Sequence, residues 1–297
     1  MADVNLGVLA AIATCVLSAV SRIILKKGLQ GVSPLVATVV SMAIGFIALA
    51  VPAVPKLVAE GADIRRSGAI WFLFIGLIAP PVVRGLTYIG ISQVGVARTD
   101  QIRSAQPLFA IFFAAMILGE RPRALWYLAA GLTLAGVYFL VHEQRATSSA
   151  TGVRSRGWVF PFAAAIIAGL VVIARKHGTE LLVDPVLAAF FSATSGLLVG
   201  TVYLLWTGKW RELLASKASL SLLALAGVLT ASTDILDIYA LTQADVHIIV
   251  PILGTTPLFV TLLSSLFLKE EVITKKTWIA AVMIFLGLQL SVVVGGL

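Results

Sequence analysis

Apolar residues dominate this chain in ten long runs, which short polar stretches separate. The runs cover residues 6–25, 34–54, 68–93, 96–118, 124–141, 158–174, 185–206, 220–241, 246–268 and 277–294. Each is close to the roughly 20 apolar residues that an α-helix needs to cross a bilayer. The pattern therefore predicts an all-α membrane protein with ten transmembrane helices.

The composition agrees with a lipid environment. Of the 297 residues, 59% are hydrophobic and 12% are charged, whereas soluble proteins carry about 25% charged residues. The net charge of +8 lies mostly between the apolar runs, where lipid headgroups explain it, so we expect no nucleic-acid partner. No basic residue precedes the first run, so we expect a retained helix and no cleaved signal peptide.

The two halves of the chain are related by an internal repeat. Five runs precede the polar stretch 143–157 and five follow it, so we interpret 1–142 and 158–297 as two units joined by a polar linker loop. Pro107-Leu108-Phe109 recurs as Pro257-Leu258-Phe259, a shift of 150 residues (107 to 257), and Glu120 falls on Glu270 at the same shift. Because five is odd, the second half would cross the membrane in the opposite sense. The predicted fold is thus a five-plus-five inverted-topology repeat, an arrangement typical of secondary transporters.

The repeated motifs also carry a family resemblance. The stretch Gln106-Pro107-Leu108-Phe109-Ala110, then Leu118-Gly119-Glu120-Arg121 and a helix with Gly131 and Gly136, resembles the EamA domain of the drug/metabolite transporter superfamily. The second copy runs from Thr256-Pro257-Leu258-Phe259 to Leu268-Lys269-Glu270-Glu271 and Gly287, and departs from the Gly-Glu-Arg pattern. Two such units would cover nearly the whole chain. The resemblance implies an exporter or exchanger of small metabolites, driven by an ion gradient or by counter-exchange. It also implies that spans one, three, four, six, eight and nine line a central cavity.

The orientation in the membrane is a point of conflict. The resemblance implies a multi-pass protein of the cell (inner or plasma) membrane with both termini in the cytoplasm. The loops that this orientation places outside hold more lysines and arginines, among them Lys26 and Lys27, than the loops placed inside, which include Arg175 and Lys176. The positive-inside rule favours the reverse orientation.

Several charged residues interrupt the apolar runs. A charge at mid-bilayer costs at least ~2.5–3.5 kcal/mol and normally faces a cavity or a partner. The candidates for substrate binding or coupling are these charged residues together with two uncharged polar residues, Tyr88 and Thr255. The charged candidates are Arg22, Arg84, Asp100, Arg103, Asp234 and Asp237. Asp100 and Arg103 share a helical face and could form a purely structural pair. Arg22, one turn before Lys26, could instead reach the headgroups.

The signs of these charges suggest a substrate. Asp234 and Asp237 lie one turn apart, so we hypothesise that one of them takes up a proton and couples transport to a proton gradient. Arg84 and Asp234 differ by 150 positions and could form an ion pair across the two halves. Arg84 or Arg103 could hold a carboxylate. Groups of both signs favour a zwitterion such as an amino acid as the substrate of an alternating-access transporter, with exchange of organic anions as the alternative.

Prolines and a glycine mark possible bends inside the runs. The expected hinge or cavity-lining residues are Pro80, Pro81, Pro107, Pro251, Gly254 and Pro257. Proline frees a carbonyl within a helix, and such carbonyls can line a cavity. A static kink explains the same residues equally well.

A membrane enzyme is the competing class of function. The three histidines, His142, His177 and His247, have no metal-ligand spacing, and the chain has no phosphate-binding Gly-rich loop with Lys-Ser/Thr. We therefore expect no enzyme activity, no metal and no cofactor. The small-residue faces of the fifth and tenth runs could pack within one chain or between two, so a monomer and a homodimer remain open.

Overall fold

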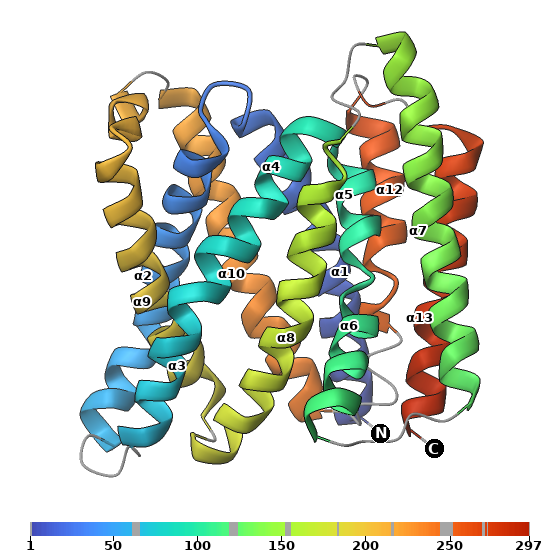
Figure 1. The fold of residues 1–297 in the computed structure, drawn as a ribbon. Helices are drawn as coiled ribbons and strands as arrows, with labels where there is room; N and C mark the ends of the chain where they lie inside the picture. Colours follow the sequence, from blue (N-terminus) through green and yellow to red (C-terminus); the bar gives the residue numbers. More distant parts are fainter. Residues whose placement is uncertain are drawn as a thin grey trace.

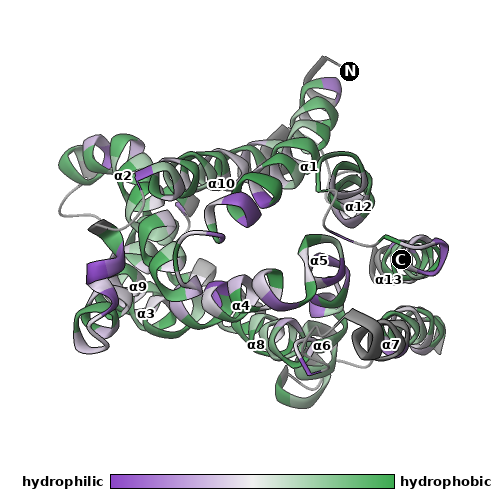
Figure 2. Cartoon of the chain, turned by 90° about the horizontal axis from the view of Figure 1, so that it is seen from above, coloured by the Kyte–Doolittle hydropathy of each residue, from purple (hydrophilic) through white to green (hydrophobic). Residues whose placement is uncertain are grey.

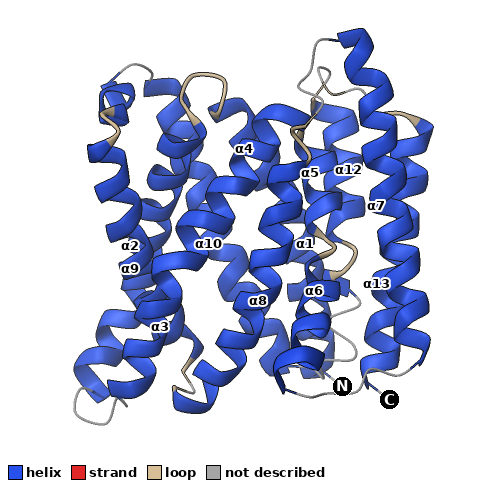
Figure 3. Ribbon diagram, viewed as in Figure 1, coloured by secondary structure: helices blue, strands red, loops and turns tan. Residues whose placement is uncertain are grey.

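The computed structural model describes residues 2–60, 66–118, 124–151, 156–182, 184–214, 217–243, 252–268, 271 and 273–296. Throughout this part of the chain the regular elements are helices (Figure 3). They are α1 (Ala2–Gly28), α2 (Pro34–Glu60), α3 (Arg66–Ile78), the π-helix η1 (Ala79–Arg84), α4 (Gly85–Val94), α5 (Val96–Arg103), α6 (Gln106–Phe113), the π-helix η2 (Ala114–Leu118), α7 (Ala124–Thr151), α8 (Val159–Leu181), α9 (Pro185–Trp206), the 3-10 helix η3 (Lys209–Leu214), α10 (Lys217–Gln243), α12 (Thr256–Phe267) and α13 (Lys275–Gly296).

The helices stand side by side as one bundle (Figure 1). The first turn of α1 and the last turn of α13 lie at the same end of it. Within the described residues, four helical stretches are long and apolar enough to cross a membrane: Asn5–Gly28, Pro34–Ala59, Ser67–Val94 and Val186–Trp206. Shorter apolar helices accompany them. The residues of the helices are mostly hydrophobic (Figure 2), and large hydrophobic side chains such as Val58, Met116 and Trp206 are exposed, as expected where lipid replaces water.

The first helix of each half packs against helices of the other half. The first helix of the first half, α1, packs on α10 and α12 of the second half. In the same way α8, the first helix of the second half, packs on α3, α4 and α6 of the first. Two further pairs, α2 with α9 and α7 with α13, join equivalent helices. The packing therefore follows the repeat that the sequence carries, and neither half is a separate lobe.

Prolines break two of the expected spans at specific points. At Pro80 and Pro81 the chain leaves α3 and forms the π-helical turn η1, because neither residue has an N–H with which to continue the α-helical ladder. A second break divides α5 from α6. There Ala105 N donates to Ile102 O (3.2 Å), and 150 residues later Thr255 N donates to Ile252 O (2.9 Å) before α12. A proline follows each of these short turns two residues on, so the two copies of the motif bend alike.

The α7–α13 pair settles where the small-residue faces pack. A Cβ added to Gly136 would meet Ile284 Cγ1 at 2.8 Å, and one added to Gly287 would meet Thr133 Oγ1 at 2.2 Å. The two helices thus approach each other closely within one chain because these glycines have no side chain. Gly131, also in α7, has nothing within 4 Å of such a Cβ and is not part of this contact.

Two helices extend further than the apolar runs indicated. Helix α7 continues to Thr151, into the stretch where we expected the polar linker. Helix α8 continues to Leu181, so Arg175 and Lys176 are helical residues and not loop residues. Loop length was misjudged because polar residues end an apolar run but do not end a helix.

The start of α9 shows how a polar residue ends a loop. Asp184 is its N-cap, and its Oδ1 accepts from Val186 N (2.8 Å) and Leu187 N (3.1 Å). Its other oxygen accepts from Lys56 Nζ at 2.5 Å. Burial opposes ionisation of this carboxyl, but the bonds from Lys56 and the two backbone N–H groups outweigh it and hold its pKa below 3.8.

Candidate functional site

Two adjoining cavities lie at the centre of the bundle. Cavity 1, of about 450 Å³, lies between α1, the α5–α6 joint, the turn before α12 and α13. Cavity 2, of about 370 Å³, lies between α1, η1, α4, α8 and α10. Both volumes are in the range of roughly 300–1,000 Å³ found for small-molecule sites. Cavities 1 and 2 together are the candidate site.

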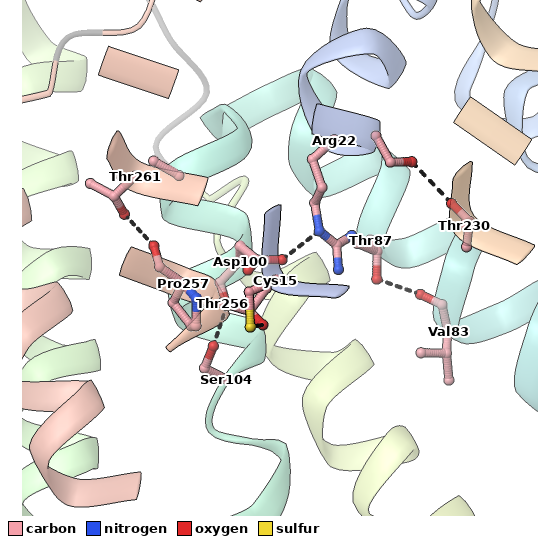
Figure 4. Close-up of polar contacts among 12 residues, drawn as sticks. Cys15, Arg22, Val83, Thr87, Asp100, Ser104, Thr230, Thr256, Pro257 and Thr261 are labelled. Carbon is pink, nitrogen blue, oxygen red and sulfur yellow. Dashed lines mark hydrogen bonds and ion pairs between the residues drawn. The ribbon is translucent and has the colours of Figure 1, made fainter. Parts of the chain in front are cut away.

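Four residues line both cavities and so form the partition between them: Ser18, Arg22, Arg103 and Gln106. Arg22 reaches from α1 towards α5, where its Nε lies 2.7 Å from Asp100 Oδ1 (Figure 4). The N–H is not aligned with the carboxylate, and the contact is an ion pair without a well-directed hydrogen bond. Asp100 is only 6% exposed. This pair joins two helices of the first half at the centre of the molecule.

This ion pair differs from two expectations. The sequence allowed the Arg22 side chain to reach the lipid headgroups, yet this side chain is 21% exposed and lines the two cavities. The spacing of Asp100 and Arg103 allowed an intrahelical pair, but Asp100 forms its ion pair with Arg22. Arg103 is the last residue of α5 and points to the partition, and its buried Nε has no hydrogen-bond partner among the described residues.

Cavity 2 adds further cations and hydroxyls. Arg84 and Tyr88 line it, as the sequence suggested for a binding site, and so does Arg175 from α8. The Tyr88 hydroxyl lies 3.0 Å from Ser41 Oγ, which fixes the ring from α2. Thr230 of α10 also lines the cavity and bonds Ser21 Oγ of α1 at 3.1 Å. A guanidinium-rich wall with hydroxyl neighbours is suited to a carboxylate or another small anion.

The two copies of the repeated motif meet at cavity 1. Ser104, Gln106 and Pro107 from the first half line it, and so do Gly254, Thr256 and Pro257 from the second. Each pair is separated by 150 positions (104 to 254, 106 to 256, 107 to 257). Cavity 1 therefore lies where the equivalent bends of the two halves face each other.

The remaining predicted residues are placed as follows. Pro80 lines cavity 2, while Pro81 is in the same π-helical turn without lining it. Thr255 is not among the lining residues, and its hydroxyl donates to Ile252 O at 2.6 Å. Asp234 and Asp237 belong to α10, but their side chains, like Pro251, lie outside the described residues. Their proposed roles stay predictions.

The lining residues that were not proposed as site candidates from the sequence include Thr14, Gln106, Arg175 and Gln289. Gln106 stands inside the repeated motif itself, so its polar side chain next to Pro107 was an available signal. Gln289 interrupts the last apolar run, and a polar residue there could also have been noticed. Thr14 gives no such signal, because threonine is common in membrane helices. Arg175 was assigned to a loop and so was not considered.

A carboxylate closes one end of the α4–α5 joint. Glu271, which follows α12, accepts from Val96 N (2.6 Å) and Ala97 N (3.3 Å) at the start of α5. Gly95 makes this turn with φ +92, where a Cβ would meet Glu271 Cδ at 2.8 Å. Burial raises the pKa of Glu271, although the two backbone bonds and the positive charges of Lys26 and Arg98 act against it.

We expect Glu271→Ala to lower the free energy of unfolding by about 1 kcal/mol, the usual cost of a lost N-cap. Glu271→Gln keeps one acceptor oxygen and should cost less. Because the folded pKa of Glu271 is raised, the wild type should gain stability relative to Glu271→Gln as the pH falls from above that pKa to below 4.5. Thermal unfolding of the two proteins over this range measures the difference. If the stabilities of the two proteins changed in parallel with pH, the raised pKa of Glu271 would be contradicted.

The comparisons with known proteins fit this architecture. A model of the EamA-like transporter family matches residues 5–142 and 155–293. The chain therefore belongs to the EamA-like transporter family, with two EamA units and the character of a multi-pass membrane protein of the drug/metabolite transporter superfamily. This confirms the resemblance read from the repeated motifs.

The solved structures support the fold alone. One crystal structure of another protein aligns with a TM-score of 0.57 at 16% identity, over 96% of each chain. Among the curated proteins, no sequence matches this chain.

Proposed function

We propose that this protein is a secondary active transporter that exports or exchanges a small metabolite, an amino acid or related zwitterion, by alternating access. The observation that carries the proposal is the ion pair of Arg22 and Asp100, with Arg103 beside it, between two cavities at the joint of the two repeats. A site with buried groups of both signs suits a guest that carries both signs. Its place between equivalent halves suits alternation between two open states.

The proposal includes the topology. Ten transmembrane helices would form a five-plus-five inverted repeat, with both termini on the cytoplasmic side of the cell membrane. The exchange of helices between the halves supports two related units, and the common end of the first and last helices supports termini on one side. The cytoplasmic side itself rests on the family resemblance.

A second candidate is exchange of organic anions. Among the described residues that line the two cavities, four are arginines, namely Arg22, Arg84, Arg103 and Arg175, and one, Asp100, is a carboxylate. Such an excess of positive charge favours a guest with more negative charge than an amino acid carries. The substrate panel below separates the two candidates.

Proton coupling through Asp234 or Asp237 is the part of the proposal that concerns the driving force. Thr230 and Thr233 of α10 line cavity 2, and the two aspartates follow them in the same helix. Asn in place of each aspartate should abolish uptake driven by a pH gradient while leaving counter-exchange. Intact gradient-driven uptake in both variants would remove proton coupling from the proposal.

Transport is tested in vesicles reconstituted with the purified protein. We would measure uptake of labelled L-amino acids, dicarboxylates and organic amines, with protein-free vesicles as the blank. The expected result is saturable uptake of at least one amino acid, reduced tenfold or more in Arg22→Gln and unchanged in Arg98→Gln, which lines neither cavity. Saturable uptake of dicarboxylates alone would favour the second candidate. Absence of saturable flux for every compound would contradict transport of these classes.

A further inference from the structure

The partition between the cavities holds an uneven set of charges. Arg22 and Arg103 both line cavities 1 and 2, while Asp100 lines cavity 1 alone. Asp100 contacts the Nε of Arg22, and Ser104 next to it donates to the backbone oxygen of Asp100 and not to its carboxylate. We call Arg22, Asp100 and Arg103 the partition cluster. With one carboxylate for two guanidinium groups, the cluster has a net charge of +1.

Asp100 contacts Arg22, so Arg103 is the guanidinium of the cluster that has no ion pair of its own among the described residues. The Nε of Arg103 is buried and has no hydrogen-bond partner in the described part of the chain. Its other neighbours at the partition, Ser18 and Gln106, are polar but neutral. A buried cation normally has an anionic partner, because withdrawal of its charge from water is costly. A guanidinium also offers two parallel N–H groups to one carboxylate.

We propose that the substrate's carboxylate binds at the partition, between Arg22 and Arg103, and that Asp100 determines how much negative charge the substrate may carry. The inference rests on the proposed function and adds the position and charge rule of the guest. One added carboxylate brings the cluster to neutrality. An amino group on the same guest then meets Asp100, whose carboxylate faces cavity 1. A dicarboxylate would instead bring a second negative charge next to Asp100, where like charges repel.

The charge rule can be reversed by one isosteric change. Asp100→Asn keeps the shape of the side chain and raises the cluster to a net charge of +2. The variant should therefore bind a dicarboxylate better than the wild type does, and an amino acid worse. Asp100→Glu keeps the carboxylate and should keep the preference of the wild type, so it separates charge from any loss of folding.

The test is binding of four small probes to the purified full-length protein: glycine, acetate, methylammonium and succinate, at constant ionic strength. A ligand that binds the folded state raises its melting temperature, and the concentration dependence provides an apparent Kd. Glycine and acetate should stabilise the wild type and methylammonium should not. Arg103→Gln should weaken the binding of glycine and of acetate at least tenfold. Asp100→Asn should shift the ratio of succinate to glycine affinity at least tenfold towards succinate.

Arg98→Gln is the matched control, because it removes the same charge from the same helix α5 without lining either cavity. Any of three results overturns the inference. Glycine and acetate could leave the wild-type melting temperature unchanged, or Arg98→Gln could weaken their binding as much as Arg103→Gln does. The third is that Asp100→Asn keeps the wild-type ratio of succinate to glycine affinity. If the probe-binding test fails but vesicles show saturable amino-acid flux, the partition is not the binding position, and the proposal of transport is unaffected. Absence of flux together with the expected probe binding removes transport instead.

Discussion

Replacement of Arg22 by glutamine is expected to lower the free energy of unfolding by about 3–5 kcal/mol, the cost of removing one partner of a buried ion pair. The reason is the position of Asp100, which is 6% exposed and loses the cation that lies 2.7 Å from it. An unpaired carboxylate in a membrane helix is among the least favourable groups that a fold can hold. Thermal or denaturant unfolding of the purified protein measures the loss.

A double variant shows whether the loss belongs to the pair. In Arg22→Gln/Asp100→Asn neither side chain is charged, so most of the stability should return, and the coupling between the two sites should be large. Transport should stay low in the double variant, because the partition then lacks the arginine that we assign to the substrate. A double variant as unstable as Arg22→Gln would show that Arg22 acts by packing and not by its charge.

The chain offers a matched ion pair for comparison. Lys56 and Asp184 also lie in contact, but their side chains are 40% and 20% exposed. Exposed pairs contribute about 0–1 kcal/mol, so Lys56→Gln should cost far less than Arg22→Gln. Equal costs would mean that burial does not control the strength of these pairs.

The second large effect is expected from Gly287→Ala, which should destabilise the protein by about 1–3 kcal/mol, as overpacking does in a close-packed contact. The added Cβ would lie 2.2 Å from Thr133 Oγ1, 2.8 Å from Thr133 N and 2.9 Å from Ala129 O. Two of these three atoms are backbone atoms of α7, so rotation of a side chain cannot relieve the clash. Helices α7 and α13 would have to move apart.

Gly131→Ala is the control, for which no destabilisation is expected. A Cβ at Gly131 has nothing within 4 Å, and alanine favours a helix over glycine by up to about 1 kcal/mol. Gly131→Ala should thus leave the melting temperature unchanged or raise it, while Gly287→Ala lowers it. A fall of similar size in both variants would show that the glycines act through flexibility and not through the α7–α13 contact.

Much of the fold could be predicted because its signals are local. A run of apolar residues reports a helix in lipid wherever it packs, and the repeat is visible because Pro107 and Pro257 sit in the same short motif 150 positions apart. The bends at these motifs follow as well, since proline removes a backbone donor whatever its surroundings. The prediction was weaker where a signal depends on the end of a run, as with α7 and Arg175.

The candidate site could be predicted only in part. Charges within apolar runs had to face a cavity or a partner. Each of the following predicted residues lines at least one of the two cavities: Arg22, Arg84, Tyr88, Asp100 and Arg103. The ion-pair partner of Asp100 could not be predicted from the sequence in the same way. The spacing of Asp100 and Arg103 suggested a local pair, whereas Asp100 contacts an arginine 78 positions earlier in the chain (22 to 100).

Local signals were enough to identify a duplicated helical membrane protein of a transporter family, because hydrophobic length, proline bends and repeated motifs act within one segment and need no knowledge of its neighbours. The packed bundle was needed to show that Arg22 pairs with Asp100, that Arg175 and Gln289 line the cavities, and that Gly287 packs on α7 of the same chain. These contacts depend on which faces of distant helices meet, and that choice is made by packing over the whole bundle.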